Sequence, residues 1–306
     1  MTQAVGSTPE TLVPKRRSRY LRDRQRAGFL FSLPVMALIL AFLAIPIVQT
    51  FYQSFTAWDG ITSTWTGLQN YQYLAGAPTF WQVVENNLVL LASIPLAILI
   101  PLIVAFLLNE HVTGWRFFRS VYFLPTSISW VVIGMVAIRF FASEGILNGV
   151  LRTFGLGFIH TDLLSGEGSA LAAVIITFIW SVFGTNTIIF ITGMATLDRE
   201  VYEAARVDGA GAMQTLIHIT IPMLMRFIQF AFILTVITAF TALFSLIFIM
   251  TQGGPGFATT TLEFFIWDRA FKVGTFGLAS AIGVVLFAVV FVIWIAQYRI
   301  LRSRTD

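Results

Sequence analysis

Runs of twenty or more largely apolar residues recur through this sequence of 306 residues, and they limit what it can fold into. A helical run of that length crosses the roughly 30 Å of hydrocarbon in a bilayer. Charged residues make up 11% of the sequence, whereas a soluble domain carries about a quarter. The sequence therefore predicts an all-α integral membrane protein rather than a water-soluble fold.

Six apolar runs can be placed between polar or basic segments. They are expected at about residues 28–51, 83–108, 119–142, 169–193, 223–250 and 275–298. The first run is longer than the apolar region of a signal peptide, so a retained helix is expected there despite its basic flank. The prediction is one transmembrane domain of six helices, residues 27–300, between a basic tail, residues 1–26, and a short tail, residues 301–306.

The distribution of positive charge predicts the orientation. Of the 19 Lys and Arg residues, fifteen fall in the two tails and in or beside the second and fourth connections, on one side of the predicted membrane. Cytoplasmic loops carry such an excess. Both tails are therefore expected in the cytoplasm, and the net charge of +4 is attributed to membrane insertion, with no nucleic acid as a partner.

Aromatic residues are concentrated in the first external connection. They are Trp58, Trp65, Tyr71, Tyr73, Phe80 and Trp81. Such residues favour the interface between lipid and water, but they could also form a small folded cap on the outer face. Both interpretations are open at this point.

The fourth connection, about residues 197–222, is too long and too regular for a simple turn. Asp198 could cap a helix that runs to about Val207, where Gly209 and Gly211 interrupt it. Beyond the glycines, apolar residues at three- and four-residue spacing predict a second amphipathic helix up to Pro222. The expected element is a helix, a bend and a helix on the cytoplasmic face.

Two interpretations of this element are possible. An amphipathic helix can lie on the lipid surface, but such helices favour bulky Trp or Phe and a Lys-rich polar face, which the first helix lacks. Small residues Ala204 and Ala205, flanked by Glu203 and Arg206, would instead let a partner approach closely. Docking to another protein is the favoured interpretation.

The segment Glu203-Ala-Ala-x-x-Asp-Gly-Ala210, followed by Ile219 and Pro222, resembles the cytoplasmic EAA signature of binding-protein-dependent ABC importer permeases. Thr251-Gln-Gly-Gly-Pro255 resembles the maltose-type carbohydrate branch of that family. The resemblance extends over most of the chain, including the six-helix order.

The resemblance implies that the chain is a permease subunit of an ATP-driven importer in the bacterial cytoplasmic membrane. It would form half of the channel, with a second homologous permease chain, two ABC ATPase subunits and an extracytoplasmic solute-binding protein that delivers a carbohydrate. The segment at 197–222 would be the coupling element, whose ATPase-coupling residues are Glu203, Ala204, Ala205, Asp208 and Gly209.

No enzymatic activity is expected of this chain. It has no Gly-x-x-x-x-Gly-Lys-Ser/Thr loop, so ATP and Mg are expected on the partner ATPase subunits and no cofactor on the chain itself. Without cysteine, and with three histidines in different connections, no metal site is expected either.

The chain departs from the family pattern at three positions. Leu216 stands where an aromatic residue is common, and Arg226 stands where a second proline is frequent. Ser245 stands where the carbohydrate branch often has an acidic residue, so a charge-assisted hydrogen bond would be missing there.

Polar residues inside a membrane tend to face a bundle interior or a cavity. Those expected on the substrate path are Trp180, Asn186, Thr238, Thr241 and Ser245, and Thr235, Thr238, Thr241 and Ser245 share one face of the predicted fifth helix. Hydroxyls beside an aromatic ring suit a neutral sugar. The alternative is that these hydroxyls bond to their own helix or join two helices.

Two other functions are weighed against carbohydrate import. The cargo could be another small polar solute, such as a polyol or a glycerol-phosphodiester-like compound. A membrane-embedded enzyme that modifies lipids is less favoured, since it should carry a cluster of carboxylates or histidines at one membrane face.

Overall fold

The structure is a computed structural model that describes residues 16–109, 121–156 and 162–302. Its internal contacts divide the chain into two compact units, Met1–Tyr52 and Gln53–Asp306, and each is described by itself. The predicted tails are described only in part, because residues 1–15 and 303–306 lie outside the described ranges, as does the start of the predicted third span.

The first unit is a long apolar helix with one π turn. It comprises α1 (Arg16–Ile39), η1 (Leu40–Ala44) and α2 (Ile45–Gln53). None of the side chains described from residue 28 to residue 52 is buried. The apolar surface of this helix is therefore available to lipid or to a partner protein.

Each of two π turns lies directly before a proline. η1 precedes Pro46, and η3 (Leu216–Thr220) precedes Pro222. In both, the residue before the proline donates its N–H to the carbonyl five residues earlier. Because proline cannot donate a hydrogen bond, widening the turn keeps the helix continuous past it.

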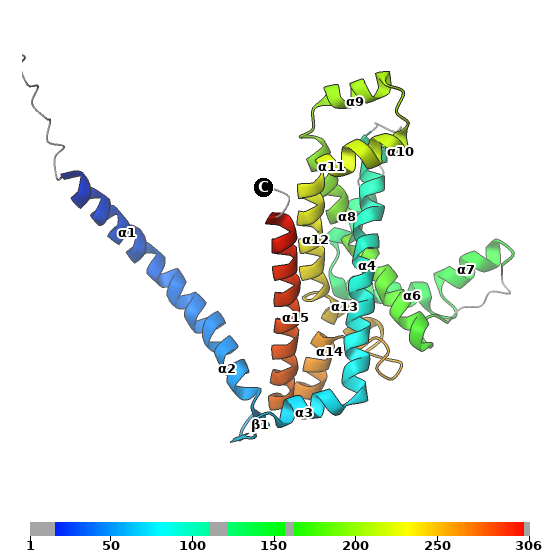
Figure 1. Cartoon of the computed structure of the whole chain (residues 1–306). Coiled ribbons are helices and arrows are strands. Elements are labelled where there is room, and N and C mark those ends of the chain that lie inside the picture. The colour runs from blue at the N-terminus through cyan, green and yellow to red at the C-terminus, as the bar shows by residue number, and fades with distance from the viewer. Residues whose placement is uncertain (1–15, 110–120, 157–161, 303–306) are drawn as a thin grey trace, which may run out of the picture. The chain divides into compact units, whose positions relative to one another are not determined.

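The second unit is a helical bundle whose core lies between α4 (Pro78–Asn109), α8 (Glu167–Met194) and α12 (Met225–Ala239) (Figure 1). α4 and α8 form the most extensive helix pair. Ile94 and Phe178, one from each, are completely buried. The predicted all-α membrane fold is confirmed.

Two of the predicted spans are interrupted. The third, predicted at 119–142, contains the short η2 (Leu124–Ser127), which includes Pro125, and then α6 (Trp130–Phe141); α7 (Ile146–Thr153) follows beyond it. The fifth ends as α12 at Ala239, turns over residues 240–242 and resumes as α13 (Leu243–Met250). Apolar composition predicted continuous helices here because it carries no information on where a helix breaks.

Five helices in the described part of the chain are long and apolar enough to cross a membrane. A sixth span results if Ala212–Met223 and Met225–Ala239 are taken together, although they meet at a bend of 75°. The expectation of six spans thus depends on this bent pair.

The connection after the first apolar helix, which carries the clustered aromatic residues, forms a folded cap. β1 (Thr56–Trp58) pairs antiparallel with β2 (Ser63–Trp65), and α3 (Gln69–Gly76) follows. The side-chain amide of Asn70 donates to the carbonyls of Ser54 and Thr56, both at 2.9 Å. The cap packs on the start of α15 (Phe276–Arg302), where a Cβ at Gly277 would overlap the carbonyl of Thr56. Of the two interpretations, the structure supports the cap.

Asn186 joins the three central helices at one point. Its side-chain amide, on α8, donates to the carbonyl of Ala97 on α4 at 2.9 Å and to Oγ1 of Thr235 on α12 at 3.1 Å. The carbonyl of Ala97 would normally bond to the N–H four residues later, but that residue is Pro101. Asn186, which is 1% exposed, supplies the donor that proline removes.

We expect Asn186→Leu to destabilise the purified chain by about 1–3 kcal/mol, since the buried carbonyl of Ala97 loses its only side-chain donor. In a Pro101→Ala background, the new backbone N–H can bond to that carbonyl, so the same substitution should cost about 1 kcal/mol less. Unfolding of the four variants in detergent measures this coupling.

Asn87→Leu is the matched control, because Asn87 is also buried on α4 but bonds to Val83 of its own helix. Its cost should be the same with or without Pro101. Equal costs of Asn186→Leu in both backgrounds would contradict the bridging role.

Candidate functional site

The fourth connection forms the predicted helix, bend and helix. α9 (Arg199–Val207) ends at Val207 as predicted, Gly209 adopts a positive φ of 78°, and α10 (Ala212–Thr215) follows. A residue with a Cβ would be strained at that φ, so Gly209 sets the bend. Asp198 occupies the position before the helix but makes no capping bond through its side chain. In Figure 1, α9 and α10 lie at the end of the bundle opposite β1 and α3.

The outward face of α9 differs in part from the expected one. Glu203, Ala204 and Asp208 are exposed, whereas Ala205 is 6% exposed and packs inward. Its small side chain thus serves contacts within the chain. Val207 is 87% exposed and lies one turn beyond Ala204, so it belongs to the same outward face. The sequence analysis did not include Val207 in that face. Val207 could have been found from the sequence, because it is an apolar residue between charged ones just before the glycine bend.

Glu203 is held by its own helix. Its Oε1 lies 3.1 Å from Nε of Arg199, one turn earlier, and both side chains are exposed. A surface pair at this spacing contributes about 0.3–0.5 kcal/mol, so a basic group on a partner could replace Arg199 at little cost.

The element is fixed to the helix that follows it. The hydroxyl of Tyr202 on α9 lies 3.3 Å from Oγ1 of the buried Thr220, which in turn donates to the carbonyl of Thr215. From there α11 (Ile221–Met223) leads into α12 through the 75° bend at Leu224, whose side chain is completely buried. A displacement of α9 is thus connected to α12 by packed and hydrogen-bonded groups.

A polar cavity of about 240 Å³ lies beside α12, between α8 and the interrupted third span. Its lining residues are Pro125, Thr126, Ile128, Trp130, Ile133, Ser181, Val182, Thr185, Asn186, Leu234, Thr235 and Thr238. None of these described residues is charged. The cavity suits an uncharged polar solute.

The predicted path residues fall in different places. Asn186 and Thr238 line the polar cavity. Thr241 is exposed in the turn after α12, and Ser245 lies beyond the turn on α13, so the four hydroxyl residues do not share one continuous helix. The break at residues 240–242 is the physical reason for the difference.

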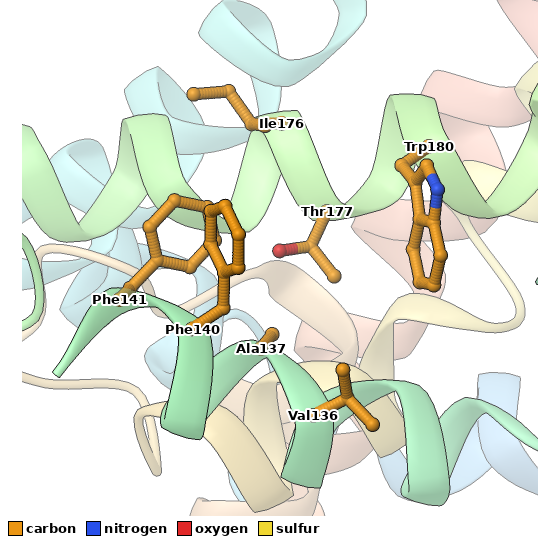
Figure 2. Close-up of a pocket in the computed structure, with 7 residues that line it drawn as sticks. All are labelled: Val136, Ala137, Phe140, Phe141, Ile176, Thr177 and Trp180. Carbon is orange, nitrogen blue, oxygen red and sulfur yellow. The ribbon is translucent and has the colours of Figure 1, made fainter. Parts of the chain in front are cut away.

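Trp180 lines a second cavity, of about 330 Å³, between α6 and α8. Figure 2 shows its ring at one end of this cavity, the rings of Phe140 and Phe141 at the other and Thr177 between them. This cavity is almost wholly apolar, since the hydroxyl of Thr177 donates to the carbonyl of Ala173. Trp180 and Asn186 therefore point into separate spaces.

Trp130 is the aromatic residue that lies beside the hydroxyls. It is half-buried, lines the polar cavity and stacks on Phe178 with ring centroids 6.3 Å apart. The sequence analysis missed it, because a continuous third helix gave no reason to select one tryptophan. Its position, shortly after the interruption at Pro125, brings it to the cavity.

Comparisons with known proteins agree with this geometry. Residues 25–306 match the model of the family described as binding-protein-dependent transport system inner membrane component. The chain is 34% identical over 281 residues to the probable ABC transporter permease protein YurN of Bacillus subtilis, covering 90% of this chain and 96% of that protein. It is 31% identical over 279 residues to the multiple sugar-binding transport system permease protein MsmF of Streptococcus mutans, covering 90% and 95%.

A solved bacterial ABC transporter that imports the acidic polysaccharide alginate contains a chain of the same fold. The TM-score is 0.80 at 22% identity, over 94% of this chain and 100% of that one. The family matches the transport role expected from the sequence, in which the chain has no ATPase site of its own. This chain belongs to the family of inner membrane components of binding-protein-dependent transport systems, and it is a multi-pass permease subunit.

Proposed function

We propose that the chain forms half of the channel of an ATP-driven importer for an uncharged carbohydrate. The observation that carries the proposal is the uncharged cavity lined by Trp130, Asn186, Thr235 and Thr238. Thr235 and Thr238 lie on α12, which the 75° bend joins to the coupling element. A second permease chain forms the other half, and an extracytoplasmic binding protein delivers the sugar. Both tails and α9 face the cytoplasm, where the positive charge is concentrated.

The hydrogen bonds of the cavity favour a solute that donates. The hydroxyls of Thr126, Ser181 and Thr238 each donate to a backbone carbonyl three or four residues earlier. The amide of Asn186 donates to Ala97 and Thr235. The oxygens of these three hydroxyls remain as acceptors, and the indole N–H of Trp130 is a donor. Sugar hydroxyls can donate to these oxygens, and the ring of Trp130 offers a face on which a sugar can stack.

The lack of charge among the described lining residues of the cavity favours a carbohydrate over a glycerol-phosphodiester as the cargo. A glycerol-phosphodiester carries a negative charge, and no described lining residue is cationic to offset its desolvation. A polyol remains compatible with the cavity. Names of relatives support a sugar: MsmF is a multiple sugar-binding transport system permease, and LacF of Rhizobium radiobacter is a lactose transport system permease.

Coupling follows from the element at the cytoplasmic end. Glu203, Ala204, Val207 and Asp208 form the exposed face that docks on an ATPase subunit, one of two in the complex, which binds ATP and Mg. On docking, a basic group of the ATPase replaces Arg199 as the partner of Glu203. Movement of α9 reaches α12 through Tyr202, Thr220 and the bend at Leu224, and so changes the wall of the cavity.

Purification of the tagged chain from native membranes, with mass spectrometry of stoichiometric partners, tests the assembly. We expect a P-loop ATPase, a second permease chain and a binding protein that retains neutral sugars. Recovery of the chain alone, under conditions that keep a known importer intact, would contradict the proposal. A binding protein that retains only anionic solutes would contradict the cargo.

Glu203→Lys should leave the chain inserted and assembled but lower sugar-stimulated ATP hydrolysis by the complex at least about tenfold, because a like charge then faces the basic group of the ATPase. Glu144→Lys is the control: Glu144 is also exposed and paired with an arginine, Arg152, at 3.1 Å, outside the coupling element. Normal stimulation in the Glu203 variant would remove this residue from the coupling site.

Thr238→Val should lower the initial rate of sugar uptake about fivefold while basal ATP hydrolysis persists, since one hydrogen bond of about 1 kcal/mol to the solute is lost. Thr241→Val is matched to it, because both hydroxyls donate to the carbonyl four residues earlier at 2.8 Å, but Thr241 lies outside the cavity. Equal effects of the two substitutions would show that the cavity wall is not the path.

A further inference from the structure

The turn that interrupts the fifth span begins at the cavity and ends at a carboxyl group. Thr238, at the cavity wall, accepts hydrogen bonds through its carbonyl from the N–H groups of Thr241 and Ala242, at 3.3 and 2.9 Å. α13 starts at the next residue. The N–H of Phe244, in its first turn, donates to Oε2 of Glu263 at 3.2 Å. The first N–H groups of a helix have no partner within it, so Glu263 satisfies a donor that the break leaves free.

Glu263 belongs to a segment that is also held by α4. It lies on α14 (Leu262–Trp267), in the connection between α13 and α15 and outside the membrane-spanning helices. The side-chain amide of the buried Asn86 on α4 donates to the carbonyls of Phe257 and Thr260, just before α14, at 2.8 and 2.9 Å. Glu263 thus connects a part of the chain held by α4 to the start of α13.

Aromatic rings surround the contact. Phe244 on α13 has its ring centroid 6.1 Å from that of Phe264 and 5.9 Å from that of Trp267, and Phe248 is 5.0 Å from Trp267. Burial among such groups raises the pKa of Glu263 from 4.5 to about 7, although the Phe244 N–H opposes the shift. The carboxyl group is therefore placed where its proton is exchanged near neutral pH.

Few charged groups lie near this carboxyl in the described chain. On the same segment, Asp268 is paired with Arg269 and Lys272 at 3.7 and 3.5 Å. The ammonium of Lys272 also lies over the rings of Phe264 and Trp267, 5.5 and 5.0 Å from their centroids. Among the neighbouring elements, α13 has no charged residue, α4 has Glu85, which is exposed, and α15 has Arg299 and Arg302 near its far end. No ion pair joins Glu263 to any of these described residues, so the backbone N–H of Phe244 is its recorded partner.

We propose that Glu263 is a positioning residue, which fixes the break in the fifth span by accepting the Phe244 N–H and thereby sets the position of Thr238 in the cavity wall. The carboxyl accepts this bond in either protonation state, but the charged state is disfavoured by the surrounding rings. Raising the pH through about 7 therefore places an unfavourable charge in this buried site, even though the Phe244 N–H binds the carboxylate more strongly than the neutral acid. The significance of the Thr238 position for transport rests on the proposed function, but the contact between Glu263 and Phe244 does not.

The test uses the purified full-length chain in detergent and two substitutions, Glu263→Gln and Glu263→Leu. Gln at position 263 keeps an acceptor oxygen without a charge, and Leu keeps the bulk without an acceptor. Because the chain contains no cysteine, a single spin label can be placed on Thr241→Cys, in the turn itself. The label should stay immobile in Glu263→Gln and lose its immobile spectral component in Glu263→Leu. An immobile label in the Leu variant would overturn the proposal.

A pH profile gives the second readout. A raised pKa means that the folded chain retains a proton that the unfolded chain has released, so the stability present below pH 4.5 is lost as pH rises through about 7. The unfolding midpoint of the wild type should therefore fall by about 4 °C between pH 5 and 8.5 relative to Glu263→Gln. Histidines contribute equally to both proteins and cancel in the comparison. The same slope in both proteins would overturn the proposal.

These measurements separate the two hypotheses. Neither requires ATP hydrolysis or a known solute. An importer with an immobile turn in the Leu variant would retain the proposed function and lose the role of Glu263. A chain that shows both the mobile turn and the pH difference, but has no ATPase partner, would retain the role of Glu263 and lose the importer.

Discussion

The bundle depends on the hydrogen bond from Asn186 to Ala97, which replaces the backbone hydrogen bond that Pro101 cannot make. Pro101 deprives the carbonyl of Ala97 of its partner in α4, and the amide of Asn186 replaces that partner from α8 while also bonding to Thr235 on α12. An unsatisfied carbonyl in this core would cost about 1–3 kcal/mol. Pro101 is therefore best accommodated with α8 and α12 in their present register, and this register also places Thr235 and Thr238 at the cavity.

The helix that carries Thr235 and Thr238 is fixed to the core by this bridge and is interrupted at both ends. α12 contacts α4 and α8 through the Asn186 bridge, while both of its ends are interrupted, by the 75° bend at Leu224 and by the turn at residues 240–242. Interruptions in spanning helices are accommodated where neighbouring groups satisfy the backbone. Tyr202 and Thr220 connect one end to α9, and Glu263 holds the other.

The features that could be predicted from the sequence are those that depend on the spacing of apolar residues and on local residue types. The apolar runs gave the membrane fold, and the glycines of the fourth connection gave the bend and the end of α9 at Val207. The breaks after Ala239 and before Trp130 were not predicted, because polar partners from distant segments, such as Glu263 for Phe244, decide where a helix stops. Trp180, which was selected, lines the apolar cavity, whereas Trp130, which was not, lines the polar one. Ala205 was expected to face a partner, but it packs inward.

The hydroxyls of the cavity bear on how tightly a solute can be held. The hydrogens of Thr126, Ser181 and Thr238 are committed to backbone carbonyls, so each of these three hydroxyls offers one or two lone pairs and no donor. A sugar must then exchange hydrogen bonds with water for single, neutral ones to the wall, each contributing about 1 kcal/mol. A few such contacts and one aromatic face give recognition without tight retention. That balance suits a channel, where a solute held by charge would leave slowly, and it places the burden of selectivity on the protein that delivers the solute.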